Sequence, residues 1–523
     1  MTIASEYVGE ETGARPEAGP EVGPEAEHGA VHWRLGLRRD AELDSSRPGG
    51  TLQVTAPFGA LALGAPPAGI RAALAALAGG ERSEDELAAT VVRRDGEAGL
   101  LRWHLMLRKL DGHGLLEHAL HLDRPDAEAH APQQVRPVAR LRVVGRGAGA
   151  PGPAPDPAGR LRLSRFATAT PQDGLLAVRA PGNPLAVELG PAGAVLLGAL
   201  ADWTTPALLA HRAGSLPLDA VRQALRLFAA AGLLTQGGPG REQPEERRLA
   251  QWSAADLAFH AHTRFPGTVA ASGGTYPGAA RFAPEPASPP PFPGERIALP
   301  VPDLELAAGR ERPFAQILED RRSIRDHDEE PLTVDQLAEL LYRTVRRRQT
   351  FVGSDGQELA DRPCPSGGAV HELEVYPLVG SCAGVPAGLW HYATDRHELE
   401  RVAEPGPATA ALLTAARETS LMTADPQVLL LITARFGRVM WKYEAVAYPL
   451  ILKHVGVLYQ SLYLTGTAMG LAVCGLGGGD AADFATASGL DWLTEGTVGE
   501  FVVGSRPATL RQDIGVPRRE ARR

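Results

Sequence analysis

The chain has 523 residues, with 53 Lys and Arg against 62 Asp and Glu, which gives a formal net charge of −9 at pH 7. A nucleic-acid surface needs clustered positive charge, so this acidic balance argues against DNA or RNA as a partner. The length predicts roughly three compact units at about 150 residues each. The three cysteines, Cys364, Cys382 and Cys474, form no Cys-x-x-Cys pair. This excludes a disulfide framework and a cysteine-rich zinc site, and it is typical of a reducing compartment.

Residues 1–29 are rich in Glu, Pro, Gly and Ala. Such a segment lacks the apolar content needed to fold, and it does not have the basic start and apolar core of a secretion signal. We therefore predict a disordered tail. No run of eighteen apolar residues occurs in the chain, so we expect a cytoplasmic protein without a membrane partner.

Two segments, 30–144 and 158–236, share one pattern. Gly114-Leu115-Leu116 recurs as Gly232-Leu233-Leu234, an offset of 232 − 114 = 118 positions. In each copy, short strands precede three predicted helices, and the third helix ends at the repeated glycine. We expect two diverged copies of one small unit.

Three small helices followed by a glycine and a strand resemble a winged-helix unit. The predicted third helices, 99–110 and 218–231, carry only scattered basic residues, so DNA reading is not expected. Peptide recognition, in which an extended segment adds to a strand edge, suits an acidic chain better. A purely structural role of both units is the alternative.

Two segments rich in Gly and Pro, 145–157 and 237–298, are predicted to be linkers. The second contains a short predicted helix from Trp252 to Arg264. His260 and His262 on this helix point away from each other, so packing explains them better than a metal site. No metal is expected in this protein.

Residues 299–523 contain the motifs that indicate chemistry. Arg321-Arg322-Ser323-Ile324-Arg325 can hold a phosphate through charge-assisted hydrogen bonds, although a solvated salt-bridge site is the alternative. Pro365-Ser366-Gly367-Gly368 can bring its backbone close to a flat ring, unless it is only a tight turn. A third run, Gly475 to Asp480, lacks the order of a Rossmann or P-loop motif.

Lysine is rare in this chain. Only Lys109, Lys442 and Lys453 occur, so 53 − 3 = 50 basic residues are arginine. Lysine can release its proton whereas arginine effectively cannot. Lys442 is followed by Tyr443 at the boundary of two predicted elements, which places two titratable groups together for proton transfer. A surface lysine at a helix start is the alternative interpretation.

Six motifs, in this order, resemble those of the SagB-type dehydrogenases of the nitroreductase superfamily, the flavin enzymes of thiazole/oxazole-modified peptide biosynthesis. They are Arg-Arg-Ser-x-Arg, Pro-Ser-Gly-Gly, Trp-Lys-Tyr-Glu, Gly-Val-Leu-Tyr-Gln, Gly-Gly-Gly-Asp and Gly-Glu-Phe-Val-Val-Gly. The resemblance covers about residues 299–510. It implies an α+β fold in which a nitroreductase-like FMN domain follows two winged-helix-like units that resemble leader-peptide recognition elements. The second unit, 158–236, is the one expected to be peptide-recognition-like, and binding by one unit or by both is left open. The resemblance also implies an intertwined homodimer with FMN at the subunit interface.

The resemblance also assigns residues. The FMN phosphate and ribityl chain are expected at Arg321, Arg322, Ser323, Arg325 and Arg506, and the flavin ring at Pro365, Ser366, Gly367, Gly368, Gly477 and Gly478. Lys442 and Tyr443 match the lysine and tyrosine on which these enzymes depend. Two departures stand out: Cys364 replaces a residue that is more often aromatic, and Pro449 interrupts a predicted helix that it could kink or delay.

The implied reaction removes two hydrogens from an azoline ring of a precursor peptide, one as hydride to the flavin and one as a proton to a base. Lys442 is the candidate base, with Tyr443 as its hydrogen-bond partner or as the alternative base. A lysine base near neutral pH requires that burial lower its pKa by about three units from about 10.4. Dioxygen is the expected oxidant of the reduced FMN, and a cyclodehydratase that makes the azoline is a candidate partner.

Three other functions are compatible with parts of the sequence. An NAD(P)H-dependent nitroreductase or flavoreductase shares the FMN residues but does not need Lys442. An oxidase of a nonribosomal peptide assembly line acts on carrier-tethered substrates. A flavin-free peptide-binding scaffold needs no cofactor at all.

Overall fold

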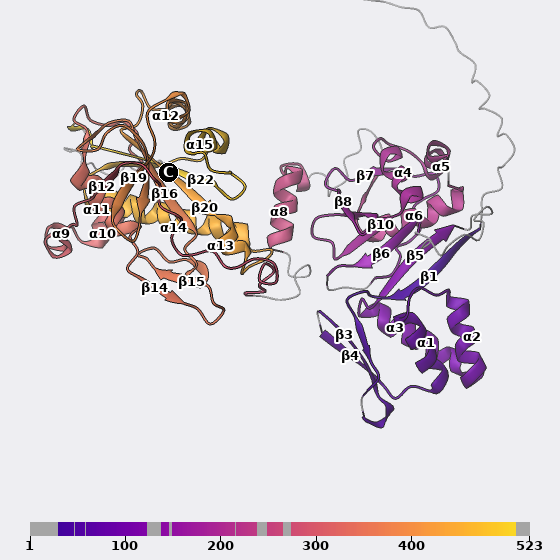
Figure 1. Ribbon diagram of the computed structural model, residues 1–523. Coiled ribbons are helices and arrows are strands. Elements are labelled where there is room, and N and C mark those ends of the chain that lie inside the picture. Colours follow the sequence, from indigo (N-terminus) through magenta and orange to yellow (C-terminus); the bar gives the residue numbers. More distant parts are fainter. Residues whose placement is uncertain are drawn as a thin grey trace, which may run out of the picture. The chain divides into compact units, whose positions relative to one another are not determined.

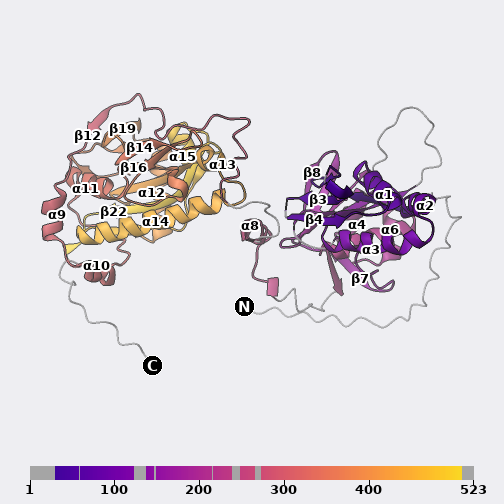
Figure 2. The same ribbon diagram turned by 90° about the horizontal axis from the view of Figure 1, so that it is seen from below.

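The computed structural model describes residues 30–46, 48–57, 59–122, 137–145, 149–214, 216–237, 248–264 and 273–508. The chain divides into two compact units, Met1–Ala270 and Ala271–Arg523 (Figures 1 and 2). The tail predicted at residues 1–29 lies outside the described residues. Among the helices described, none is both long enough and apolar enough to cross a bilayer.

The N-terminal unit is built around one antiparallel sheet to which both predicted copies contribute. Its strand order is β1-β5-β6-β10-β9-β8. The strands are β1 (Val31–Leu37), β5 (Leu116–Leu122), β6 (Ala139–Val143), β8 (Thr168–Gln172), β9 (Leu175–Arg179) and β10 (Leu185–Leu189). Because β6 pairs with both β5 and β10, the two copies share a sheet, which the repeat in the sequence did not predict.

Each copy supplies three helices. They are α1 (Ala68–Ala78), α2 (Glu84–Asp95) and α3 (Ala98–Gly112) in the first copy, and α4 (Pro191–Ala199), α5 (Pro206–Ala213) and α6 (Leu218–Ala230) in the second. The repeated glycines that follow the third helices have positive φ, +65° at Gly114 and +66° at Gly232. Glycine adopts this conformation without steric cost. The repeat is therefore visible in the structure, while the winged-helix assignment stays a prediction.

Smaller elements complete this unit. A three-stranded sheet contains β2 (Glu42–Asp44), β3 (Leu52–Ala56) and β4 (Gly59–Gly64), with β4 at one edge, and β7 (Arg160–Leu163) pairs with β11 (Leu234–Gly237). The helix predicted near residue 254 is α8 (Ala254–Arg264). The His260 ring lies 5.3 Å from that of Trp252, in agreement with a packing role.

Parts of both predicted linkers are packed structure. Gly152 donates its N–H to the Arg226 carbonyl, and Arg226 Nε donates back to the Gly152 carbonyl, at 3.1 and 3.0 Å. Residues 273–298 belong to the C-terminal unit, where the Phe292 ring meets Tyr376 edge-on at 6.0 Å. Gly and Pro content reports backbone preferences only, so these side-chain contacts were not predicted.

The C-terminal unit contains a seven-stranded antiparallel sheet in the order β12-β19-β18-β16-β20-β22-β21. Its strands are β12 (Arg296–Ala298), β16 (Leu373–Val379), β18 (Gly388–Ala393), β19 (Glu398–Ala403), β20 (Val428–Arg435), β21 (Ala472–Gly475) and β22 (Glu495–Gly504). The main helices are α11 (Val334–Thr344), α12 (Pro407–Ser420), α14 (Ala447–Ala468) and α15 (Ala481–Ser488). An antiparallel sheet with such helices agrees with the predicted α+β class.

Helices cover both faces of this sheet, and α14 runs along one of them (Figure 2). Val503 packs in the core that contains the α11 and α14 side chains, whereas Val502 packs in the core that contains those of α12 and α15. Neighbouring residues of a strand point to opposite faces, which produces this division.

The shorter elements lie around the sheet. They are α9 (Leu304–Arg310), α10 (Phe314–Asp320), α13 (Phe436–Met440), β13 (Leu332–Thr333), β14 (Gln349–Val352), β15 (Glu358–Asp361), β17 (Cys382–Ala383) and the 3-10 turn Gly367–Ala369, whereas a second 3-10 turn, Pro48–Gly50, belongs to the N-terminal unit. Pro449 is the third residue of α14. The first four N–H groups of a helix have no partner within it, so proline is tolerated there. The helix continues through Pro449, but it begins only at Ala447, which is 447 − 442 = 5 residues after Lys442, so of the two expected effects the structure fits a delayed start.

A buried histidine lies between two carboxylates in the C-terminal unit. His391 Nδ1 is 3.4 Å from Glu400 Oε2, and its Nε2 is 3.4 Å from Glu374 Oε2. Burial lowers the pKa of His391, but the two carboxylates outweigh burial and raise the pKa to about 9. Since the folded-state pKa exceeds that of the unfolded chain, this histidine stabilises the fold below pH 6.5, and its contribution is lost as the pH rises to about 9.

We predict that His391→Gln removes this pH dependence. The change from 6.5 to about 9 corresponds to about 3 kcal/mol. The wild type should therefore lose up to about 3 kcal/mol relative to the variant between these pH values, measured by denaturant unfolding of the full chain. His327→Gln is the control, because burial lowers the pKa of His327 to about 4 and its contribution is constant above pH 6.5. A difference between wild type and His391→Gln that does not change with pH would contradict the prediction.

Candidate functional site

The Pro-Ser-Gly-Gly turn lies against the first half of α14. The Gly367 N–H donates to His454 Nε2 at 2.7 Å, and His454 Nδ1 is 2.6 Å from Glu372 Oε1. Because a backbone N–H can only donate, Nε2 is the acceptor and Nδ1 carries the proton that it donates to Glu372. Glu372 is completely buried, so a neutral histidine between a carboxylate and a backbone amide fixes the turn.

The same turn touches the Lys-Tyr pair. Gly368 has a φ of +66°, and a Cβ at this position would collide with the Tyr443 hydroxyl oxygen and lie 3.6 Å from Lys442 Cε. Only glycine permits both the conformation and this approach. The structure therefore brings together two motifs that are more than 70 positions apart in the sequence.

Lys442 forms an ion pair that the sequence did not reveal. Its Nζ lies 3.0 Å from Asp355 Oδ2, and the Tyr276 hydroxyl donates to the same oxygen at 3.0 Å. Burial lowers the pKa of Lys442, but the hydrogen bond and charge of Asp355 outweigh burial and raise the pKa above its usual value. The expectation of a lowered lysine pKa is thus not met in this arrangement.

The arginine motif lies near the second half of α14. Ser323 Oγ is 2.8 Å from the Tyr463 hydroxyl, which accepts the Gly475 N–H at 2.8 Å. The Ile324 N–H donates to the Val473 carbonyl at 3.0 Å. The motif is therefore fixed beside β21, where the glycine-rich loop begins.

The cations of this motif remain available to an anion. Arg321 lies over the Tyr463 ring, 5.2 Å from its centroid, and Arg322 and Arg325 are exposed. None of the three arginines forms an ion pair with another residue that the structure describes. Arg506 is buried after β22, and its neighbour Ser505 accepts the N–H of Asp328, which follows the motif.

The glycine-rich loop exposes its backbone. A Cβ at Gly477 would meet no atom within 4 Å, and one at Gly478 would meet only Thr419 Cγ2 at 3.9 Å. Gly479 lies on the Glu500 carboxyl, whose burial raises its pKa to about 7. Another molecule can thus approach the backbone at Gly477 and Gly478.

The two groups of motif residues are separated along α14. His454 and Tyr463 are 463 − 454 = 9 positions apart, or about 13.5 Å at 1.5 Å per residue. Uncompensated arginines at one place and a close-approach glycine turn at the other fit an elongated ligand with a phosphate and a flat ring. The donor set therefore fits FMN, the cofactor that the resemblance implies.

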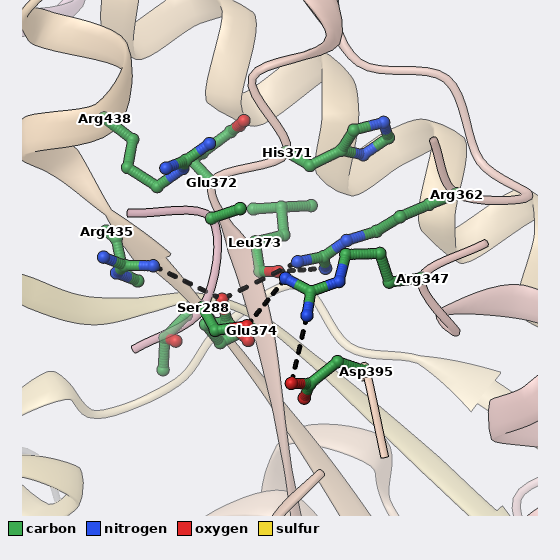
Figure 3. Close-up of polar contacts among 12 residues, drawn as sticks. Ser288, Arg347, Arg362, His371, Glu372, Leu373, Glu374, Asp395, Arg435 and Arg438 are labelled. Carbon is green, nitrogen blue, oxygen red and sulfur yellow. Dashed lines mark hydrogen bonds and ion pairs between the residues drawn. The ribbon is translucent and has the colours of Figure 1, made fainter. Parts of the chain in front are cut away.

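A small cavity of about 30 Å³ lies at the turn, lined by Thr344, Val345, Arg362, Cys364, Pro365, Ser366, His371, Glu372, Leu373, His454 and Leu458. Such a volume holds about one water molecule. Arg362, Arg347 and Arg435 converge near Glu374 in this region (Figure 3). Cys364, the departure from the family pattern, lines this cavity, and its Sγ donates to the Thr344 carbonyl at 3.2 Å.

Arg438 holds three chain segments around the site. Its guanidinium donates to the carbonyl oxygens of Glu285 at 2.6 Å, Glu358 at 2.8 Å and Val370 at 3.1 Å. The Arg438 carbonyl in turn accepts from Gln357 Nε2 at 2.9 Å. Sequence reasoning assigned no role to Arg438, His454, Asp355 or Tyr276, because none has a neighbour in the sequence that indicates its partner.

Comparison with known proteins finds two family models that each match one region of the chain. Residues 318–505 match the model of the nitroreductase family, and residues 161–267 match that of the cyanobactin oxidase ThcOx. Each match covers less than half of the chain. The C-terminal unit is therefore nitroreductase-like in sequence, and the second N-terminal copy lies in the segment similar to ThcOx.

The chain is also similar to individual proteins. The chain is 26% identical to a nitroreductase-like protein of Methanocaldococcus jannaschii over 35% of this chain and 85% of that protein. It is 29% identical to the trifolitoxin-processing protein TfxB of Rhizobium leguminosarum bv. trifolii, over 28% of this chain and 41% of TfxB. It also matches a chain of the E. coli microcin synthetase McbBCD complex, with 20% identity, coverage of 51% and 98%, and a TM-score of 0.31.

We predict that Gly368→Ala destabilises the protein more than Gly489→Ala. Both glycines have positive φ, but a Cβ at Gly489 would meet no atom within 4 Å. Backbone strain should lower the free energy of unfolding of Gly489→Ala by about 1 kcal/mol. The alanine at 368 also displaces Tyr443, so Gly368→Ala should lower it by roughly 2–3 kcal/mol. Denaturant unfolding of each variant measures the difference.

A double variant identifies the cause. Tyr443→Phe removes the oxygen that an alanine at 368 would strike, so Gly368→Ala should cost less in that background. If Gly368→Ala and Gly489→Ala lower the free energy of unfolding equally, the Gly368 turn is not in close contact with Tyr443.

Proposed function

We propose that the protein is an FMN-dependent dehydrogenase that oxidises azoline rings to azoles in a ribosomally synthesised, post-translationally modified peptide. The observation that carries this proposal is the contact of the Gly368 turn with Lys442 and Tyr443. It puts a backbone suited to a flat ring beside groups that can transfer a proton. The order of the six motifs and the similarity to the nitroreductase and cyanobactin oxidase models support the proposal.

The cofactor residues are those that the resemblance assigns, and the fit of the donor groups supports them. The phosphate and ribityl chain are assigned to Arg321, Arg322, Ser323, Arg325 and Arg506, and the ring to Pro365, Ser366, Gly367, Gly368, Gly477 and Gly478. When bound, FMN supplies the acceptor for the hydride. A second copy of the chain is the proposed partner, and the exposed apolar side chains Phe314, Leu318 and Leu452 are available to such a contact.

The residues of the site handle the proton. Aromatisation breaks two C–H bonds of the azoline, and one hydrogen leaves with its electron pair while the other leaves as a proton. Lys442 and Tyr443 are the two proposed proton acceptors. Lys442 is protonated while it is paired with Asp355, so it can accept a proton only after it has released its own.

Substitution of Lys442 tests this function. Lys442→Ala should keep the visible absorbance of bound flavin but lose azoline oxidation by roughly 100-fold or more, because a positioned proton-transfer group contributes that much. Mass spectrometry of an azoline-bearing peptide, seeking loss of two hydrogens per ring, gives the readout. Lys453→Ala is the matched control, since Lys453 is an exposed lysine of α14.

The remaining outcomes separate the alternatives. Normal turnover by Lys442→Ala would sink the assignment, and full activity of Lys442→Arg would show that the lysine does not accept the proton. Rapid flavin reduction by NADPH would favour a nitroreductase. Activity that is limited to carrier-tethered substrates would favour an oxidase of a nonribosomal peptide assembly line. Purified protein without flavin absorbance would favour the scaffold.

Peptide docking is proposed for the first N-terminal copy. Leu101 and Leu105 on α3 are 71% and 57% exposed. At the equivalent positions of the second copy, 118 residues later in α6, the chain has the polar residues Asp219 and Gln223. Lys109 of α3 donates to the Ala62 carbonyl of β4 at 2.8 Å. The apolar face of α3 is thus near an edge strand to which an extended precursor peptide can add.

The residues of α6 supply the test of this docking. The double variant Leu101→Asp with Leu105→Gln should weaken binding of the peptide identified by the oxidation assay by about tenfold or more. Fluorescence polarisation of the labelled peptide measures the affinity. Leu208→Asp, at an exposed leucine of α5, is the control, and an equal loss in both variants would contradict docking on α3.

A further inference from the structure

The Lys442 amine is surrounded by groups from three parts of the C-terminal unit. Asp355 comes from the turn between β14 and β15, Tyr276 from the segment that precedes the sheet, and Tyr443 from the same segment as the lysine. Lys442 and Asp355 side chains are each 13% exposed. Within the described residues, Asp355 is the carboxylate within ion-pair distance of Lys442.

We propose that Asp355 is a positioning residue for the reaction: its ion pair holds Lys442 as a fixed ammonium ion beside the Gly368 turn, so the lysine acts as a cation and not as the base. This inference deepens the proposed function and rests on it for its catalytic consequence. The proton would then pass to the phenolate of Tyr443, which forms once the hydroxyl that contacts the same turn has given its own proton to solvent.

The carboxylate of Asp355 is itself held in place. One oxygen accepts the Tyr276 hydroxyl and the other accepts the Gln357 N–H at 3.1 Å. Gln357 is completely buried and donates to the Arg438 carbonyl. Burial raises the pKa of Asp355, but the hydrogen bonds from Lys442, Gln357 and Tyr276 outweigh burial and lower it. The pair is therefore a built contact and not a chance meeting of two surface side chains.

Backbone contacts fix the lysine from the other side. The N–H groups of Thr275 and Tyr276 lie 3.0 and 3.1 Å from the Lys442 carbonyl. The Tyr276 ring centroid is 5.9 Å from Lys442 Nζ, and the ring meets Trp441 edge-on at 5.5 Å. An aromatic ring favours a nearby cation, so both Asp355 and Tyr276 stabilise the protonated amine.

Removal of the Asp355 charge should change the direction in which the surroundings shift the pKa of Lys442. Without its partner, burial is the main influence on Lys442, and burial favours the neutral amine. Asp355→Asn keeps the size of the side chain while it deletes the charge. The pH at which Lys442 loses its proton should therefore fall in this variant.

Competitive labelling of amines with acetic anhydride measures that pH directly in the full chain with its bound cofactor. Since the chain has only three lysines, mass spectrometry resolves each one, and the exposed Lys109 and Lys453 serve as internal references. The midpoint of the pH profile reports protonation, while its plateau reports access of the reagent. In the wild type, the Lys442 midpoint should lie above the usual value for a lysine side chain, because the pair with Asp355 raises its pKa.

In Asp355→Asn, the midpoint of Lys442 should move to lower pH, and labelling at a fixed pH below it should be severalfold faster. Asp361→Asn is the matched control: Asp361 is on the same hairpin and its carboxylate pairs with Arg348 at 3.5 Å, so the Lys442 midpoint should not move. An unchanged midpoint in Asp355→Asn would overturn the proposal.

The wild-type result protects the test against a variant that does not fold. If the wild-type midpoint of Lys442 lies at or below the usual value for a lysine side chain, the proposal fails whatever the variant does. Labelling requires no turnover, so it can confirm the role of Asp355 in the protonation of Lys442 even if the protein does not oxidise azolines. Conversely, azoline oxidation with an unmoved midpoint would leave the proposed function intact and remove only the role of Asp355.

Discussion

The candidate site depends on one buried guanidinium. Arg438 is completely buried, and burial together with the nearby Arg435 and Arg362 lowers its pKa to about 10, so it is still charged at neutral pH. A buried charge is costly unless its hydrogen-bonding capacity is satisfied. Three carbonyl oxygens from distant segments accept its hydrogen bonds, and Arg438 thereby holds these three segments together.

Two of these carbonyls, those of Val370 and Glu358, fix different parts of the site. The Val370 carbonyl lies two residues after Gly368, so it anchors the turn that contacts Tyr443. The Glu358 carbonyl begins β15 and, with Gln357, holds the hairpin that carries Asp355. The turn and the carboxylate that meet at Lys442 therefore share one anchor, only four positions before the lysine in the chain. A planar group with five donors can do this, whereas an ammonium ion cannot reach three separated acceptors in one plane.

How much of this could be predicted depends on where the information lies in the sequence. The arginine motif and the glycine turn were predicted because each is a continuous run whose chemistry is evident from its own residues. Asp355 and His454 were not, because Lys442 lies 442 − 355 = 87 positions from Asp355 and Gly367 lies 454 − 367 = 87 positions from His454. The pKa of Lys442 was expected in the wrong direction for the same reason: burial was foreseen, and the carboxylate that outweighs it was not. The shared sheet of the two N-terminal copies also depends on strand pairing that no local pattern specifies.

The scarcity of lysine gains a structural meaning from this comparison. Arginine performs the tasks that need several directed donors, as at Arg438, and it is also the available cation at Arg321 and Arg325. At position 442 the acceptor is a single carboxylate oxygen, and the Gly368 backbone leaves little room beside the side chain. The compact ammonium group of lysine therefore suits position 442 better than the planar guanidinium group of arginine. This holds even if the amine never releases its proton. The lysine can thus be required for its shape and its point charge, so its rarity in the chain is not by itself evidence that it is a base.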